Sequence, residues 1–166
     1  MKTVLLPLIA FVACYGAASA DDTKPAAPAK EAPAADLWQT DFAKAQKTAR
    51  TEKKALLIFF TGSDWCGWCM KLDKQILGTE AFKTWATKNA VLVKADFPKK
   101  TKLPADVAKQ NDKLQSKYGI SGFPTIVVLD RHGARRGETG YKDMTPDEYV
   151  KDLEGIISGK KPKKAK

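Results

Sequence analysis

The sequence predicts an α/β fold in which a central mixed β-sheet is flanked by α-helices. Three short and largely apolar runs, 55–60, 90–96 and 125–129, have the length and composition of buried strands. Segments with a helical spacing of apolar residues separate these runs, and a turn with one further strand follows the last of them. Strands that alternate with helices and then close in a hairpin indicate a mixed sheet.

The first half of the domain is expected to alternate helices with two buried strands. Leu37, Phe42 and Ala45 provide the apolar side of the first helix, and Thr79 has the hydroxyl side chain of a helix N-cap. In chain order, the expected elements are a helix over 36–54, a strand over 55–60, a turn over 61–64, a helix over 67–77, a helix that begins after Thr79, and a strand over 90–96.

The second half is expected to add a helix, a hairpin and a final helix. Gly119 stands where a left-handed helix end is expected, and Thr145 with Pro146 and Glu148 has the pattern of a capping box with proline in the first turn. In chain order, the expected elements are a basic loop over 97–104, a helix over 105–117, a strand over 125–129, a turn over 130–133, a strand that ends near Tyr141, and a helix that ends near Ile157.

The N-terminal residues have the layout of a cleaved secretory signal. Lys2 precedes an apolar run, and small residues follow at 18–20. We expect a signal peptide over 1–20, an Ala/Pro-rich linker over 21–35, a domain over 36–158 and a basic disordered tail over 159–166. Lipoprotein processing at Cys14 is the less favoured alternative, because Phe11 is a poor residue at that place in a lipidation motif. The N-terminal pattern therefore predicts a periplasmic or otherwise exported protein.

Composition narrows the classes of partner. A hydrophobic fraction of 43% and a charged fraction of 29% are typical of a soluble globular protein. The formal net charge of +10 overstates the basic character of the domain, because five lysines lie in the last seven residues. We therefore expect no nucleic-acid partner, and membrane contact only through a lipid anchor or the basic tail.

The cysteines indicate chemistry rather than a structural crosslink. Removal of the signal would remove Cys14 and leave Cys66 and Cys69, which are too close in sequence to close a stabilising loop. A cysteine in the first turn of a helix lies among unpaired backbone N–H groups that stabilise its thiolate, so we expect the pKa of Cys66 below the ordinary value of about 8.5. We expect Cys66 to attack a substrate disulfide and Cys69, one turn later, to resolve the mixed disulfide.

Two motifs give the chain a family resemblance. Trp65-Cys66-Gly67-Trp68-Cys69 follows a predicted strand, and Gly122-Phe123-Pro124-Thr125 precedes another. With this pair of motifs, residues 55–158 resemble the thioredoxin superfamily, and within it exported bacterial thioredoxin-like proteins. The resemblance implies that Pro124 is cis and packs against the disulfide, which leaves the backbone of Phe123 to pair with an extended substrate.

We accordingly expect five residues to contact the substrate: Trp65, Gly67, Trp68, Phe123 and Pro124. Trp68 departs from the family pattern, because many thioredoxins have proline there; it either adds substrate contact or is a plain surface aromatic residue. The buried aspartate that assists proton transfer in thioredoxins also has no counterpart, because Ile58-Phe59-Phe60 occupies that strand end.

The sequence therefore predicts a thiol-disulfide oxidoreductase that acts on exported protein thiols and disulfides together with an upstream redox partner. No cofactor beyond the Cys66–Cys69 disulfide and no resident metal are expected. The direction of electron transfer stays open between reductase, oxidase and isomerase. Two alternatives remain: a dithiol protein that binds copper or serves a haem pathway, and a non-catalytic thioredoxin-like binding or chaperone module.

Overall fold

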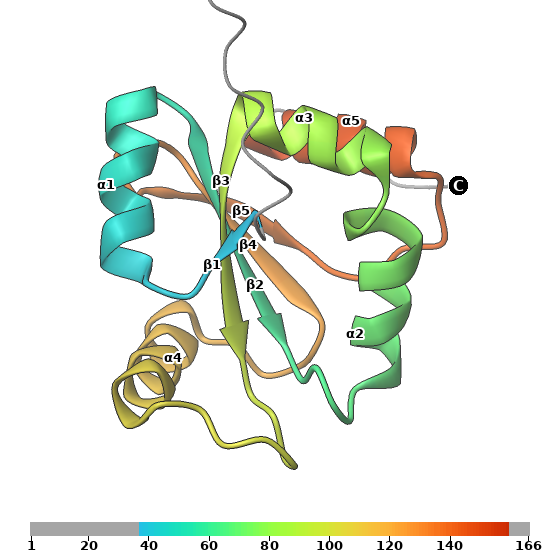
Figure 1. Ribbon diagram of the computed structural model, residues 1–166. Helices are drawn as coiled ribbons and strands as arrows, with labels where there is room; N and C mark the ends of the chain where they lie inside the picture. The colour runs from blue at the N-terminus through green and yellow to red at the C-terminus, as the bar shows by residue number, and fades with distance from the viewer. Residues whose placement is uncertain (1–36, 160–166) are drawn as a thin grey trace, which may run out of the picture. The chain divides into compact units, whose positions relative to one another are not determined.

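A computed structural model describes residues 37–159 (Figure 1). Its elements are β1 (Trp38–Gln39), α1 (Phe42–Glu52), β2 (Ala55–Thr61), α2 (Gly67–Leu72), the π-helical turn η1 (Asp73–Leu77), α3 (Glu80–Asn89), β3 (Ala90–Asp96), α4 (Ala105–Tyr118), β4 (Thr125–Leu129), β5 (Arg135–Thr139) and α5 (Pro146–Ile157). The signal peptide, Cys14, the linker and all of the basic tail except Gly159 lie outside the described residues. Between residues 37 and 159 there is no helix with the length and apolar character needed to cross a membrane.

The five strands form one mixed sheet in the order β1-β3-β2-β4-β5. Strands β1, β3 and β2 are parallel to one another, whereas β4 is antiparallel to both β2 and β5. Every residue of β2 is buried, as expected for a strand at the centre of a sheet that is covered on both faces. The predicted α/β class with a mixed, helix-flanked sheet is confirmed.

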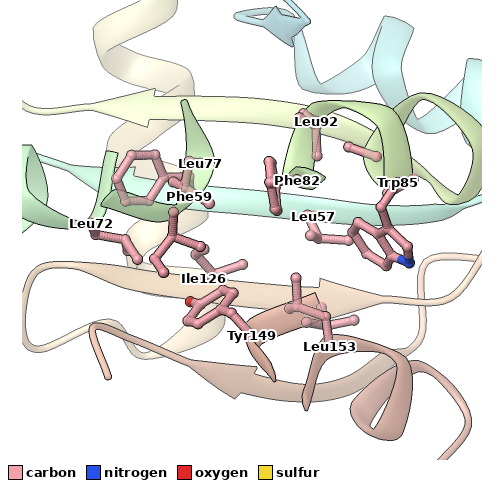
Figure 2. Packing of buried hydrophobic residues seen from close by; sticks show 14 of the residues in the cluster. Leu57, Phe59, Leu72, Leu77, Phe82, Trp85, Leu92, Ile126, Tyr149 and Leu153 are labelled. Carbon is pink, nitrogen blue, oxygen red and sulfur yellow. The ribbon is translucent and has the colours of Figure 1, made fainter. Parts of the chain in front are cut away.

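Alternate residues of β2 enter two separate cores. Leu57 and Phe59 belong to the core that the sheet shares with α2, η1, α3 and α5. Ile58 and Phe60 belong to the core that it shares with α1 and α4. Figure 1 shows the same division, with α1 and α4 on one side of the sheet and the other helices opposite, and Figure 2 shows the packing of the first core. The strand period of two places successive side chains on opposite faces.

The helix ends confirm the capping patterns in the sequence. The Thr79 hydroxyl accepts a hydrogen bond from the Phe82 N–H at the start of α3. Gly119 ends α4 with φ at 66°, in the left-handed region that glycine enters without steric cost. At α5, the Thr145 hydroxyl accepts a hydrogen bond from the Glu148 N–H, and the Glu148 carboxylate accepts one from the Thr145 N–H.

The helix expected over 36–54 begins six residues later than predicted. Trp38 and Gln39 instead form β1, which pairs in parallel with Leu92 and Val93 of β3. Asp41 then caps α1, since its side chain accepts a hydrogen bond from the Lys44 N–H. The apolar spacing suited a helix, but pairing with a strand more than fifty residues away determines the conformation.

The loop between β3 and α4 is held by a carboxylate from the segment that follows the neighbouring strand β2. The Asp64 side chain accepts hydrogen bonds from three successive backbone N–H groups, those of Lys99 at 2.9 Å, Lys100 at 2.7 Å and Thr101 at 3.1 Å. Asp64 lies in the turn expected over 61–64, and the segment that its side chain caps is distant in sequence. Its carboxylate fixes the path of the basic loop.

The capping box of α5 gives a first test. Replacing Thr145 with Ala removes the side chain that caps the helix, and we expect the free energy of unfolding to fall by about 0.5–2 kcal/mol. Urea denaturation followed by far-UV circular dichroism measures this loss. Thr51→Ala is the control, because the Thr51 hydroxyl only donates to the Lys47 carbonyl within α1. Equal losses in the two variants would contradict a specific contribution from the cap.

Stability should also depend on pH through Asp64 and Glu148. Hydrogen bonds from the Lys99 backbone hold the pKa of Asp64 below its ordinary 3.8, and those from Thr145 hold the pKa of Glu148 below 4.5. Such a carboxyl stabilises the fold above its unfolded pKa, and the stabilisation is lost as the pH falls through the folded pKa. We expect the stability difference between wild type and Asp64→Asn/Glu148→Gln to be full at pH 6 and to shrink below about pH 4. Urea titrations at each pH measure it, with Asp112→Asn as the control.

Candidate functional site

The strand directions bring four chain segments to one edge of the sheet. Thr61 at the end of β2 pairs with Asp96 at the end of the parallel strand β3. Because β4 is antiparallel to β2, its first residue, Thr125, pairs with Phe60 near that same end. Thr139 at the end of β5 pairs with Ile126 of β4. The segments after β2, β3 and β5 and the segment before β4 therefore meet here, and they contain the cysteines and the predicted proline motif.

Cys66 and Cys69 lie at this edge, at the start of α2. Cys66 is the N-cap residue of the helix, and its Sγ accepts a hydrogen bond from the Cys69 N–H at 3.2 Å. The two residues are joined by a disulfide, and their Cα atoms are 5.2 Å apart. Cys66 retains 7% exposure and Cys69 only 1%, so the Cys66 sulfur is the more accessible of the two.

The cysteines stand on an apolar floor. Both belong to the core cluster that contains Phe59 of β2 and Ile126 of β4, and Phe123 and Tyr141 pack against the same cluster. Among residues 37–159, the buried polar side chains are Thr61, Asn111 and Thr139, and none of these is ionisable at neutral pH. The surroundings of Cys69 therefore disfavour a charged sulfur until a reaction step requires one.

Trp65 forms a fixed wall beside Cys66. Its Nε1–H donates to the Phe97 carbonyl at 2.7 Å, and its ring meets the Phe123 ring edge to face with centroids 5.8 Å apart. A Cβ built on Gly62 would overlap the Trp65 indole, so only glycine leaves room for the ring at that place. Lys99 lies over the Trp65 ring, with its Nζ 4.1 Å from the ring centroid. Trp65 is nevertheless 38% exposed.

Trp68 forms a more open wall on the other side of the site. It is 58% exposed, and its ring lies 5.1 Å from the Tyr141 ring. The Lys71 Nζ is 5.1 Å from the Trp68 ring centroid and 4.9 Å from that of Tyr141. Interaction with the Tyr141 hydroxyl raises the pKa of Lys71, so this lysine carries its charge at neutral pH. The Tyr141 hydroxyl also donates to Gln75 Oε1 at 3.1 Å.

The segment before β4 completes the site. The peptide bond between Phe123 and Pro124 is cis. The Phe123 ring contacts both Trp65 and Phe97, with centroids 5.8 and 5.3 Å away. Within the described part of the chain, the Phe123 backbone takes part in no hydrogen bond. A Cβ at Gly140 would lie 2.9 Å from the Pro124 carbonyl oxygen, so the residue before Tyr141 runs close to the proline.

The sequence-predicted residues therefore gather at one place. Trp65 contacts Phe123, and Cys66 is bonded to Cys69 in the cluster against which Phe123 packs. Trp68 contacts Tyr141, which packs against the same cluster, and Gly67 is exposed. His132, the single histidine of the sequence, is exposed in the turn before β5, and its backbone N–H donates a hydrogen bond to Asp130. In residues 37–159, no three side chains of the His, Cys, Asp and Glu types are placed to hold a metal together.

Sequence reasoning missed three contributors to the site. Phe97, Gln75 and Tyr141 come from the loop after β3, from η1 and from the segment after β5. The only signal available for Tyr141 was its position at the end of the predicted hairpin strand, at the sheet edge that carries the motif. The basic loop expected over 97–104 had no assigned role, and the structure places its Lys99 against the Trp65 ring.

Comparison with known proteins identifies the family. A family model described as a thioredoxin-like domain matches residues 42–156. The chain is 33% identical over 124 residues to the disulfide bond reductase DsbH of Chlamydia pneumoniae, with 75% of each protein covered. It is also 30% identical over 111 residues to the thioredoxin-related protein DsbJ of the same organism. That match covers 63% of this chain but only 32% of DsbJ.

Solved structures agree with this assignment. A structure of DsbH oxidoreductase superposes with a TM-score of 0.70 at 32% identity, covering 73% of this chain and 83% of the other. A thioredoxin from Thermus thermophilus has the same fold, with a TM-score of 0.53 at 15% identity over 72% of this chain and 86% of its own. The family model spans most of the described residues and the cysteine pair is in place, so the chain belongs to the thioredoxin-like family and is a thiol-disulfide oxidoreductase.

Proposed function

We propose that this protein reduces disulfides of exported proteins, with Cys66 as the nucleophile and Cys69 as the resolving cysteine. One observation carries the assignment of roles: Cys66 Sγ caps the helix and is the more exposed sulfur, whereas Cys69 is almost fully buried behind it. The Cys69 N–H donates a hydrogen bond to Cys66 Sγ, and this bond stabilises a negative charge on that sulfur once the disulfide is opened.

The exchange proceeds in two displacements. The Cys66 thiolate attacks one sulfur of a substrate disulfide, forms a mixed disulfide, and releases the other substrate sulfur as a thiolate that takes a proton. Cys69 then loses its proton and attacks Cys66 Sγ, which re-forms the Cys66–Cys69 disulfide and releases the second substrate thiol. The substrate gains two electrons and the protein loses two. A reduced dithiol partner returns the pair to its starting state by the same steps.

The walls of the site would hold an extended substrate segment over the sulfurs. The unpaired backbone of Phe123, beside the cis Pro124, supplies one donor and one acceptor for a passing chain. Trp65 and Trp68 offer exposed aromatic surface on either side, and Gly67 leaves open space between them. The five substrate-contact residues expected from the sequence are therefore proposed in that role.

Two considerations support the direction and the location. The similar protein from Chlamydia pneumoniae is named a disulfide bond reductase, which favours electron flow from this chain to its substrates. Residues 1–20 have the pattern of a secretory signal, which favours action outside the cytoplasm, where disulfide-bonded substrates are found.

Single substitutions test the roles of the two cysteines. Cys66→Ser removes the attacking sulfur, so we expect reduction of a disulfide-bonded protein substrate to be lost. Cys69→Ser leaves attack intact but removes resolution, so mixed disulfides should accumulate and appear by non-reducing electrophoresis and mass spectrometry. Thr51→Ser on α1, on the other face of the sheet from α2, serves as the control and should leave exchange unchanged. Exchange at the wild-type rate by Cys66→Ser would refute the assignment.

The direction is tested by the reduction potential of the Cys66–Cys69 pair. Equilibration with glutathione buffers of known ratio, followed by acid quenching and alkylation, gives the fraction oxidised at each ratio. A reductase should have a potential near about −270 mV, the value of a reducing thioredoxin. A value near about −120 mV, that of a strong periplasmic oxidant, would show that the protein oxidises its substrates instead.

A further inference from the structure

The surface around the cysteine pair combines exposed aromatic side chains with lysines. Trp65, Trp68 and Met70 are three of the four large apolar side chains that are exposed within residues 37–159. Both tryptophans have a lysine ammonium over the ring, Lys99 on Trp65 and Lys71 on Trp68. The two sides of the site thus have the same composition, an aromatic face with a cation on it.

The two lysines stand on opposite sides of the cysteines. Lys99 belongs to the loop after β3, which lies to one side of β2 in the sheet. Lys71 contacts Tyr141, which follows β5 on the far side of β4. Because the cysteines follow β2, a chain that crosses them between the two tryptophans would pass one lysine before the disulfide and the other after it.

Among residues 37–159, the lysines around the site are not held in salt bridges. Within the described residues, Lys71, Lys99, Lys100 and Lys102 form no ion pair. On the β3 side, Asp64 accepts hydrogen bonds from three backbone N–H groups and Asp96 accepts hydrogen bonds from Ser63, so neither carboxylate pairs with a lysine in the described part of the chain. On the other side, Asp143 lies close enough to interact with Lys71 but does not pair with it.

The β3 side also continues into a hollow. A cavity of about 380 Å³ lies along the loop after β3, and Phe97, Lys99 and Lys102 are among the residues that line it. Phe97 and Lys99 both contact Trp65, so the cavity begins where that wall of the site ends. The three hydrogen bonds that backbone N–H groups of this loop donate to Asp64 hold the loop in place before any partner arrives.

From this arrangement we propose that the disulfide-bonded substrates are acidic around the reacting cysteine, with carboxylates on both sides of it that are bound by Lys99 and Lys71. This inference rests on the proposed function and specifies its substrate class. The aromatic faces hold the apolar part of the segment, and the lysines select for charge and raise the association rate. On the β3 side, Lys102 lines the cavity together with Lys99, while Asp96 and Asp112 are also in its lining.

Matched peptides test the proposal. Three peptides with one intramolecular disulfide each differ only in the residues that flank the first cysteine: Asp and Glu, Ser and Gln, or Lys. Stopped-flow measurement of their reduction by the fully reduced protein gives three second-order rate constants. We expect the acidic peptide to react about tenfold faster than the lysine peptide at low salt, and the ratio to approach one in 0.5 M NaCl, as expected for steering by exposed charges.

Charge-reversal variants locate the effect. In Lys71→Glu/Lys99→Glu the ratio between the acidic and lysine peptides should invert, and in Lys71→Gln/Lys99→Gln it should fall towards one. The ratio is independent of any change in sulfur reactivity that affects all peptides alike. Lys44→Glu/Lys47→Glu changes the net charge equally on α1, away from the site, and should keep the wild-type ratio (Figure 1).

The outcomes separate the two proposals. Reduction of the small uncharged disulfide of 2-mercaptoethanol tests the dithiol chemistry alone, and its failure with the wild-type protein would overturn the proposed function. If that reaction proceeds but the three peptides react equally, the aromatic surface alone binds substrates and the acidic class is wrong. The acidic class would also be wrong if the Lys71→Glu/Lys99→Glu variant kept the wild-type ratio. It would likewise be wrong if the rate constant fell as the protein concentration rose, because copies of this chain would then cover the site.

Discussion

The hydrogen bonds that tie the segment after β2 to the segment after β3 hold the site together. Asp96 accepts from the backbone and the hydroxyl of Ser63, and the Phe97 N–H donates to the Thr61 carbonyl. In the other direction, Asp64 accepts a hydrogen bond from the Lys99 N–H in the loop after β3, and the Trp65 Nε1–H donates one to the Phe97 carbonyl. Each bond is modest in isolation, but a group of bonds across one edge fixes the two segments relative to each other. The position of Cys66 follows from that frame.

The resolving step of the proposed mechanism has to proceed without a buried carboxylate beneath the cysteine pair. Phe59 and Ile126 form the floor under the cysteines, and the nearest strand end presents apolar residues, as the sequence indicated. Apolar surroundings disfavour a charge at this place, and in the proposed mechanism the substrate thiolate is released there just before Cys69 attacks. A base supplied by the substrate itself is consistent with a site whose buried surroundings contain only hydroxyl and amide side chains in the described residues.

Local sequence signals were sufficient for most elements of this fold. The apolar runs gave β2, β3 and β4, and Thr79, Gly119 and Thr145 marked helix ends correctly because caps depend on residues only a few positions apart. The errors lie where distant pairing decides. Trp38 is in a strand because β3 is beside it, and η1 interrupts the expected single helix over 67–77 with a π-helical turn.

The site shows the same division between local and distant information. The cysteine pair and Phe123-Pro124 were found from short motifs. The contacts of Lys99 and Tyr141 were not, because they depend on which loops the sheet topology brings to one edge. Sequence spacing alone does not reveal that arrangement.

The contrast between Trp65 and Trp68 has a consequence for how such a protein acquires new substrates. Trp65 is confined by the absence of a side chain at Gly62, by its bond to Phe97 and by Phe123, so any exchange there would disturb several neighbours at once. Trp68 rests mainly against Tyr141 and Lys71 and is largely open to solvent. A substitution at Trp68 would therefore alter the surface offered to a substrate while disturbing few neighbours, and Trp65 would keep its place beside Cys66.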